Sequence, residues 1–208
     1  MIVRANLACP PQEGVRPTNH MSSNPLFIVL SGSSGSGKTT LSRLLAQRLR
    51  LYFGISHTTR KKRLNETEGV DYYFVTPKEF ENMVHRGEFL EWATVYDHCY
   101  GTSKIPIEAC LEKGQGVVVD VDPVGALNIK KAYPGALLVF IKAPSEEVLQ
   151  KRLAHRGTES EEEKAKRLAQ VKVEEKYEKH YDHVLVNNDL QATYEELEKI
   201  IKLHHHEL

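Results

Sequence analysis

Cysteine is scarce in this sequence, and neither sign of charge is in excess. The three cysteines, Cys9, Cys99 and Cys110, are odd in number and lack the spacing of metal ligands, so neither a disulfide framework nor a zinc site is indicated. Lysine plus arginine and aspartate plus glutamate are equal at 28 each, which disfavours nucleic acid or a membrane surface as a partner. We therefore expect a reducing, cytoplasmic setting and a positive site that is local.

Long hydrophobic runs are also lacking. No apolar run approaches the roughly 18 residues of a membrane span, and residues 1–24 have no apolar centre like that of a signal peptide. Three prolines and one glycine interrupt residues 1–24 instead, which predicts a flexible arm (Pro10, Pro11, Pro17 and Gly14). The remaining length fits one compact domain with inserted segments.

Short apolar segments alternate with segments of helical periodicity. Residues 25–30, 116–121, 136–143 and 183–188 are almost wholly apolar, as in strands that are covered on both faces of a parallel sheet. Residues 38–51 carry one leucine stripe at helical spacing. This alternation predicts an α/β fold in which helices flank a parallel sheet core.

Three segments have the spacing of a capping box, which predicts a helix start at each (Thr76–Glu79, Ser160–Glu163 and Thr193–Glu196). The helix expected over 161–180 is highly charged, so we expect a solvated and mobile lid over 154–172. Between Gly54 and Lys104 the pattern changes to short strands, aromatic residues and basic clusters, which indicates an insertion carrying a second binding site.

Residues 31–40, SGSSGSGKTT, contain the G-x-x-x-x-G-K-[ST] pattern between a predicted strand and a predicted helix. In this loop glycines let backbone N–H groups face phosphate oxygens, while Lys38 reaches the terminal phosphates and Thr39 ligates Mg²⁺. The expected ATP-binding residues are Gly32, Ser33, Ser34, Gly35, Ser36, Gly37, Lys38, Thr39 and Thr40. The loop alone fits a GTPase, an ATPase motor or a kinase, but a guanine-specifying N-K-x-D run is lacking.

A kinase needs a second pocket for its acceptor, and residues 56–75 have suitable groups. Arg60 and Arg63 lie three apart, where two guanidinium groups could converge on one phosphate, and Tyr72 or Tyr73 could add a hydroxyl. Further on, Glu91 lies among apolar residues. A carboxylate accepts from the N1–H and N2 groups of guanine but is left unpaired by adenine, which can discriminate by roughly 10⁴ to 10⁵.

Seven segments, in this order and at these spacings, resemble guanylate kinase over residues 25–202: SGSSGSGKTTL, SHTTRKKR, EGVDYYFV, FLEWATVYDHCYGTS, VVVDVD, KRLAHRGTES and VNND. The resemblance implies the P-loop nucleoside monophosphate kinase fold, with a mixed α/β GMP-binding subdomain over 54–104, a helical lid over 154–172, and a core of 25–53, 105–153 and 173–208. It implies transfer of the ATP γ-phosphoryl group to GMP or dGMP with Mg²⁺.

The resemblance also implies roles for residues by motif position. The GMP phosphate would be surrounded by Arg60, Arg63, Tyr72 and Tyr100. The guanine would be met by Ser56, Glu91, Thr102 and Asp122. The catalytic set would be Lys38, Arg60, Arg152, Arg156 and Arg167. Thr39 would bind the metal directly, and Asp120 would bind it through water. Two positions depart from the family pattern, since Ser33 stands for a usual proline and Val124 for a usual glutamine.

Two rival functions remain open from the sequence. A kinase of the same fold acting on another phosphorylated acceptor would keep Lys38 and the lid arginines but would not need Glu91 and Thr102 together. A non-catalytic module that binds phosphorylated peptides resembles the enzymes too, but such modules typically lose the phosphate loop that is present here. The sequence does not give the oligomeric state.

Overall fold

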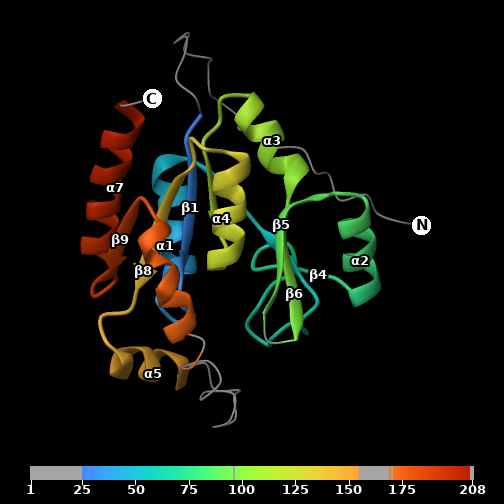
Figure 1. Cartoon of the computed structure of the whole chain (residues 1–208), viewed down its shortest axis with the longest axis horizontal. Coiled ribbons are helices and arrows are strands. Elements are labelled where there is room, and N and C mark those ends of the chain that lie inside the picture. The colour runs from blue at the N-terminus through green and yellow to red at the C-terminus, as the bar shows by residue number, and fades with distance from the viewer. Residues whose placement is uncertain (1–24, 96, 155–168, 170, 207–208) are drawn as a thin grey trace.

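The structure is a computed structural model that describes residues 25–95, 97–154, 169 and 171–206 (Figure 1). The predicted arm over 1–24, the Ser160–Glu163 capping box, most of the predicted lid, and the lid arginines Arg156 and Arg167 lie outside the described residues. No helix among the described residues is both long enough and apolar enough to cross a membrane.

The core is a five-stranded sheet in which every neighbouring pair is parallel, with the order β2-β7-β1-β8-β9. Its strands are β1 (Phe27–Gly32), β2 (Tyr52–Gly54), β7 (Val117–Asp120), β8 (Leu137–Lys142) and β9 (His183–Val186). The four predicted strands are therefore present, with ends that differ by at most two residues. The additional strand, β2, has only three residues directly after a helix, which gives too little periodicity to detect.

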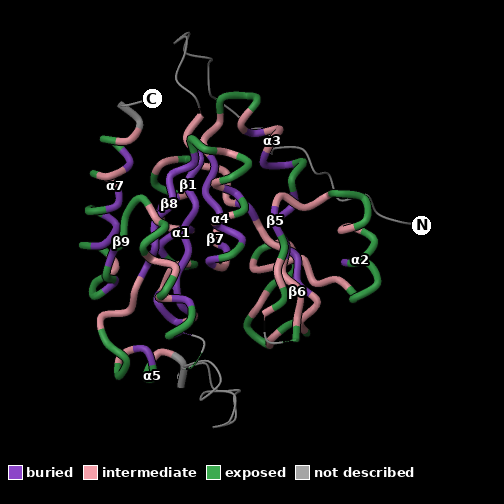
Figure 2. Tube along the Cα trace, viewed as in Figure 1, coloured by how far each residue is buried: buried purple, intermediate pink, exposed green. Residues whose placement is uncertain are grey.

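Helices cover both faces of this sheet (Figure 1). Alternate residues of β1 point to opposite faces, so Ile28 and Leu30 join one apolar cluster while Phe27 and Val29 join the other. The first cluster is completed by α1 (Lys38–Leu49) and α7 (Leu190–His206), and the second by α3 (Lys104–Glu112) and α4 (Pro123–Ala132). Figure 2 shows that the buried residues concentrate in this sheet and the helix faces against it. The described chain also contains α5 (Glu146–Ala154) and a 3₁₀ helix, η1 (Glu175–His180).

The predicted helix starts have mixed outcomes. The box before α2 (Pro77–His85) is confirmed, because Glu79 N donates to Thr76 Oγ1 at 3.2 Å and Thr76 N donates to a Glu79 oxygen at 2.8 Å. The Thr193–Glu196 box is wrong, because α7 begins three residues earlier, where Asp189 accepts from Ala192 N at 2.8 Å. Of the helix predicted over 161–180, residues 169 and 171–174 are helical and Glu175–His180 form the 3₁₀ helix, so the described part of this prediction is confirmed.

A second sheet of four strands lies beside the core, on the right in Figure 1. Its order is β4-β3-β6-β5, formed by β3 (Ser56–Thr58), β4 (Tyr73–Phe74), β5 (Phe89–Val95) and β6 (His98–Ser103). The β3–β4 pair is parallel and the other two pairs are antiparallel. Phe80 of α2 is buried and stacks on Phe89 with 4.6 Å between ring centroids, while α4 contacts β5. These contacts place the second sheet against the carboxyl end of the core strands.

Candidate active site

The phosphate loop joins β1 to α1, as predicted. Gly35 and Gly37 have φ of 88° and 90°, in the left-handed region that favours glycine. A Cβ at Gly37 would lie 2.3 Å from the Asn187 Nδ2 atom, so a side chain there is excluded by packing as well. Ser33, where the resembled family has proline, is buried in the loop, and its carbonyl accepts from Ser36 N at 3.1 Å.

Asn187 and Arg152 hold the loop from outside. Asn187 Nδ2 donates to the Ser36 carbonyl at 2.7 Å, and Asn187 Oδ1 lies 3.3 Å from the Thr193 hydroxyl. The Arg152 guanidinium donates to the carbonyls of Ser36 at 3.3 Å and Asn187 at 3.1 Å. The resemblance implies that Arg152 meets the transferring phosphoryl group, and in the structure its guanidinium lies against the backbone of the phosphate loop.

Lys38 and Thr39 face the end of β7. Lys38 Nζ lies 4.0 Å from Asp120 Oδ1, and the Thr39 hydroxyl donates to the other oxygen of Asp120. A hydroxyl and a carboxylate next to a phosphate loop fit Mg²⁺, which takes one or two protein oxygens and completes its shell with waters and substrate phosphates. Within the described parts of the chain, no group of three or more His, Cys, Asp and Glu side chains could hold a metal.

An open cavity of about 160 Å³ lies between the phosphate loop and the second sheet. Among its walls are twelve residues that the sequence predicts for the site: Gly32, Ser34, Lys38, Thr39, Ser56, Arg60, Arg63, Tyr72, Glu91, Tyr100, Asp120 and Asp122. The other described site residues are not among those that line the cavity: Ser33, Gly35, Ser36, Gly37, Thr40, Thr102 and Arg152. The cavity is also lined by three residues that the sequence did not predict for the site: Val95, Val121 and Glu174.

Strand register brings two polar side chains of the cavity wall, Ser56 and Glu91, into one row with Thr102. Thr102 on β6 is opposite Ser56 on β3 and opposite Glu91 on β5. Thr102 Oγ1 donates to Glu91 Oε1 at 2.6 Å and lies 3.1 Å from Ser56 Oγ. Because the Thr102 proton is used by Glu91, the Ser56 hydroxyl is the donor to Thr102. The row presents a carboxylate to the cavity in a fixed orientation.

Burial dominates the electrostatics of Glu91. Its side chain is 7% exposed, and burial raises its pKa to about 7, helped by the charge of Asp122 and opposed by the hydrogen bond from Thr102. Burial also raises the pKa of Asp122, which caps α4 by accepting from Val124 N at 3.0 Å and Gly125 N at 3.2 Å. Val124, where the resembled family has glutamine, is 43% exposed and is not among the residues that line the cavity.

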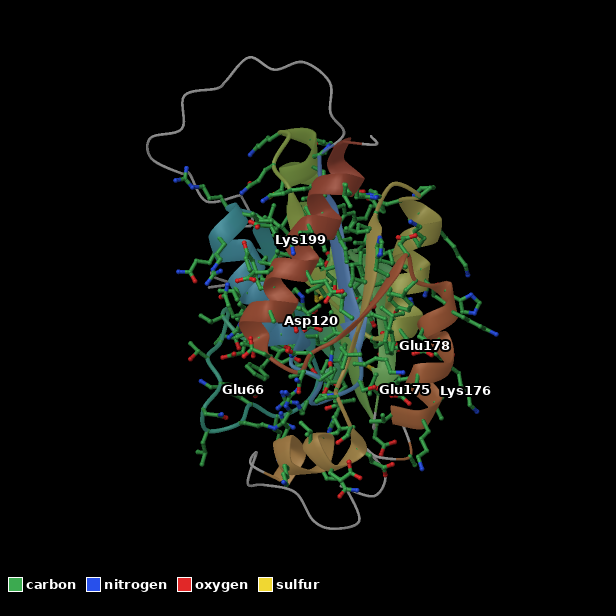
Figure 3. All side chains as sticks on the ribbon, turned by 90° about the vertical axis from the view of Figure 1, so that its left-hand side faces the viewer. Glu66, Asp120, Glu175, Lys176, Glu178 and Lys199 are labelled. Carbon is green, nitrogen blue, oxygen red and sulfur yellow. The ribbon has the colours of Figure 1, made fainter. Side chains whose placement is uncertain are left out.

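The two arginines of the second sheet converge on one carboxylate, Glu66. Arg60 Nη1 and Nη2 donate to the two Glu66 oxygens at 3.0 and 2.7 Å, and Arg63 Nη1 lies 3.7 Å from Glu66 Oε1. Although burial alone would raise it, the pKa of Glu66 is lowered by the hydrogen bonds from Arg60 and the Arg63 backbone. Figure 3 shows Asp120 near the centre of the molecule and Glu66 nearer its periphery. Glu66 pairs with both arginines but is not among the residues that line the cavity, and no motif in the sequence marked it.

Aromatic rings fix the remaining faces of Arg60. Its guanidinium lies 5.5 Å from the Tyr72 ring centroid and 5.9 Å from that of Phe74. The Tyr72 ring meets Tyr100 edge-on at 5.9 Å, and burial raises the Tyr72 pKa, which keeps its hydroxyl a donor. Of the two tyrosines that the sequence offered, Tyr72 lines the cavity, whereas Tyr73 stacks on His57 at 4.8 Å.

Comparison with known proteins gives one consistent result. The sequence model of the guanylate kinase family matches residues 24–204. A guanylate kinase of Helicobacter pylori is 42% identical over 183 residues, which are 88% of this chain and 89% of that protein. One of Symbiobacterium thermophilum is 46% identical over 177 residues, or 85% and 84% of the two chains. The crystal structure of guanylate kinase from Anaplasma phagocytophilum superposes with a TM-score of 0.74 at 29% identity, covering 88% of this chain and 87% of that one.

Proposed function

This chain belongs to the guanylate kinase family, and we propose that the cavity between its phosphate loop and its second sheet is where the family's reaction takes place. That reaction is the transfer of the γ-phosphoryl group of ATP to GMP, giving ADP and GDP. The fold is accordingly that of the P-loop nucleoside monophosphate kinases. The residue roles, the metal and the cellular compartment given below are our proposals.

The row of Ser56, Thr102 and Glu91 is the observation that best supports GMP as the acceptor. Guanine presents two adjacent donors, N1–H and the N2 amine, and an ionised Glu91 held by Thr102 can accept from both. Adenine offers an acceptor at N1 and would leave the buried carboxylate unpaired, which is the arrangement that gives strong rejection. Asp122, whose charge raises the Glu91 pKa, stands beside the same edge of the base.

The contacts of Arg60 support a phosphate site next to the guanine row. Glu66 and the Lys61 carbonyl together take both Nη1 protons and one Nη2 proton. The other face of the guanidinium meets the Tyr100 side chain through a hydrogen bond. In our proposal the Nε and second Nη2 protons on that face turn to two phosphate oxygens when GMP binds. In our proposal Arg63, Tyr72 and the Tyr100 hydroxyl complete the shell around the GMP phosphate.

Transfer itself needs no covalent enzyme intermediate. An oxygen of the ionised GMP phosphate attacks the γ-phosphorus in line, so catalysis consists of positioning and charge stabilisation. Lys38 would contact the transferring phosphates, with Arg156 and Arg167 assisting from the lid, while Arg152 would act through the backbone of the loop it holds. Mg²⁺ bound at Thr39 and, through water, at Asp120 would neutralise charge on the phosphates of ATP.

The division of the chain fits this chemistry. We propose that residues 54–104 and 154–172 close over the core when both substrates are bound, which excludes water as a competing acceptor. Few cysteines and balanced charge support a cytoplasmic location, with ATP and GMP as the small-molecule partners and neither nucleic acid nor membrane.

An acceptor panel tests the proposal. ADP formation from ATP is measured with GMP, dGMP, AMP, CMP, UMP and no acceptor, with Mg²⁺ and with excess chelator. Turnover with GMP and dGMP alone, abolished by the chelator, is expected. Equal turnover with another nucleotide would refute the guanine site, and turnover without an acceptor would refute the exclusion of water.

A further inference from the structure

The helix that starts at the phosphate loop is tied to the loop that carries Tyr72. Arg43 of α1 donates from Nη2 to the Val70 carbonyl at 3.0 Å and to Asp71 Oδ1 at 2.8 Å. These partners lie 27 and 28 residues further along the chain, in the segment that connects to β4. The Arg43 guanidinium also lies 5.7 Å from the ring centroid of Phe53 on β2, so the core sheet supports its position.

The segment that Arg43 holds is closed on itself by hydrogen bonds. Asp71 Oδ2 accepts from Thr67 N at 2.6 Å, and the Thr67 carbonyl accepts from Asp71 N at 2.9 Å. Gly69 N donates to the Tyr72 carbonyl at 2.9 Å. Other contacts join the segment to the second sheet, since Glu68 accepts from Phe74 N at 3.1 Å and the Tyr72 ring meets Tyr100. The guanidinium of Arg43 ties it to helix α1 of the core.

Tyr72 immediately follows the tied residues and is the wall of the cavity that faces Arg60. Lys38 begins the same helix as Arg43, five residues earlier, or about 7.5 Å along the helix axis at 1.5 Å per residue. The ion pair thus connects the element that carries the donor-site lysine to the segment that carries an acceptor-site tyrosine. A displacement of this segment would change the shell of the GMP phosphate without touching the phosphate loop.

We propose that Arg43 is a positioning residue for the acceptor: through Val70 and Asp71 it sets the place of Tyr72, and so the affinity for the GMP phosphate. This inference rests on the proposed function of the cavity. The Arg43 side chain is 39% exposed and that of Asp71 is 23% exposed. Ion pairs so exposed contribute little to global stability, so the effect of losing this one should appear in substrate binding rather than in folding.

The test compares Arg43→Gln with Arg48→Gln. Arg48 lies on the same helix but donates to Gln191 at 2.9 Å and stacks on Tyr194, both on α7 and away from the acceptor segment. For Arg43→Gln we expect a KM for GMP raised about tenfold, with kcat and the KM for ATP within about twofold of wild type. Arg48→Gln should leave all three constants within about twofold of wild type. In a double-mutant cycle, the effects of Arg43→Gln and Asp71→Ala should be less than additive, because both remove the ion pair, while Asp71→Ala also removes the bond from Thr67 N.

Hydrogen exchange of the backbone amides of residues 67–72 separates this inference from the proposed function. Faster exchange in Arg43→Gln, but not in Arg48→Gln, is expected whether or not GMP is the acceptor. If the wild type does not phosphorylate GMP, the proposed function fails. If hydrogen exchange of residues 67–72 is also unchanged in Arg43→Gln, the structural role of the Arg43–Asp71 contact fails as well. If GMP is phosphorylated but its KM is unchanged in Arg43→Gln, or the KM values for ATP and GMP rise together, the positioning role is wrong.

Discussion

Replacing Glu91 with glutamine should stabilise the unliganded protein at alkaline pH while it weakens GMP binding. Glutamine has the shape of glutamate and keeps an oxygen for the 2.6 Å hydrogen bond from Thr102. It removes the charge that burial disfavours, which is the cause of a Glu91 pKa of about 7 against an ordinary value of 4.5. The same charge is what the two guanine donors require.

The size and sign of the stability effect follow from the two pKa values of Glu91. Because the folded state binds this proton more tightly than the unfolded state, the stability it contributes is fully present below about pH 4.5 and is lost as pH rises to about 7. The difference corresponds to about 3 kcal/mol of unfolding free energy. The neutral variant escapes this loss, so its gain over wild type should grow from near zero at pH 4.5 to about 3 kcal/mol at pH 8.

The effect on GMP follows from the lost acceptor. The glutamine amide offers one oxygen and directs its NH₂ group at a guanine donor, so two hydrogen bonds to a charged group are lost or weakened. At about 1.5–3 kcal/mol for each such bond, kcat/KM for GMP should fall by roughly 10² to 10⁴. Stability and guanine recognition therefore oppose each other at this residue.

Urea unfolding at pH 5 and pH 8, with kcat/KM for GMP at pH 8, measures both effects. Glu81→Gln is the control, because this glutamate on α2 is 69% exposed and should show neither effect. A variant that is no more stable than wild type at pH 8, or equally stabilised at both pH values, would refute the account of Glu91 burial. Wild-type kcat/KM would refute its role as the guanine acceptor.

Three further predictions concern the loop and the guanine row. Lys38→Met should lower kcat, measured by rapid quench, by about 10² or more, while the Kd for GMP, measured by titration calorimetry, stays nearly unchanged. An equal loss of kcat and of GMP affinity would contradict the role of Lys38 in transfer. Thr102→Val removes a hydrogen bond that lowers the Glu91 pKa, so the acidic limb of the pH profile of kcat/KM for GMP should move to higher pH; an unmoved limb would contradict the coupling. Gly37→Ala should lower Tm and ATP binding more than the control Gly114→Ala. Gly114 also has a positive φ, of 74°, but a Cβ there would meet nothing within 4 Å, so the control shows the effect of backbone strain without the clash.

Local patterns predicted much of this structure. The phosphate loop, the four longer core strands and the Thr76 cap each depend on residues close together in the sequence, and each is present. The Thr193 box failed because Asp189, four residues earlier, caps the helix first. The Thr193 hydroxyl donates to the Asp189 carbonyl at 2.7 Å instead, so its spacing to Glu196 was a coincidence within a longer helix.

The support around the site could not be predicted in the same way. Glu66 acts on Arg60 only because the chain turns back within six residues, and Arg43 meets Asp71 only when two separate segments have folded together. Neither contact leaves a periodicity or a motif, since both residues look like ordinary surface charges in the sequence. By contrast, Ser56, Glu91 and Thr102 were predicted together through the family resemblance, and strand register explains why they are adjacent.

The ratio of the dissociation constants for AMP and GMP, measured by titration calorimetry in the wild type and in Glu91→Ala, tests the central claim most directly. The wild type should favour GMP by a factor of about 10³ or more, whereas the variant should bind both weakly and nearly alike, through the phosphate contacts that they share. An unchanged ratio in the variant would contradict the claim that Glu91 recognises guanine in this cavity.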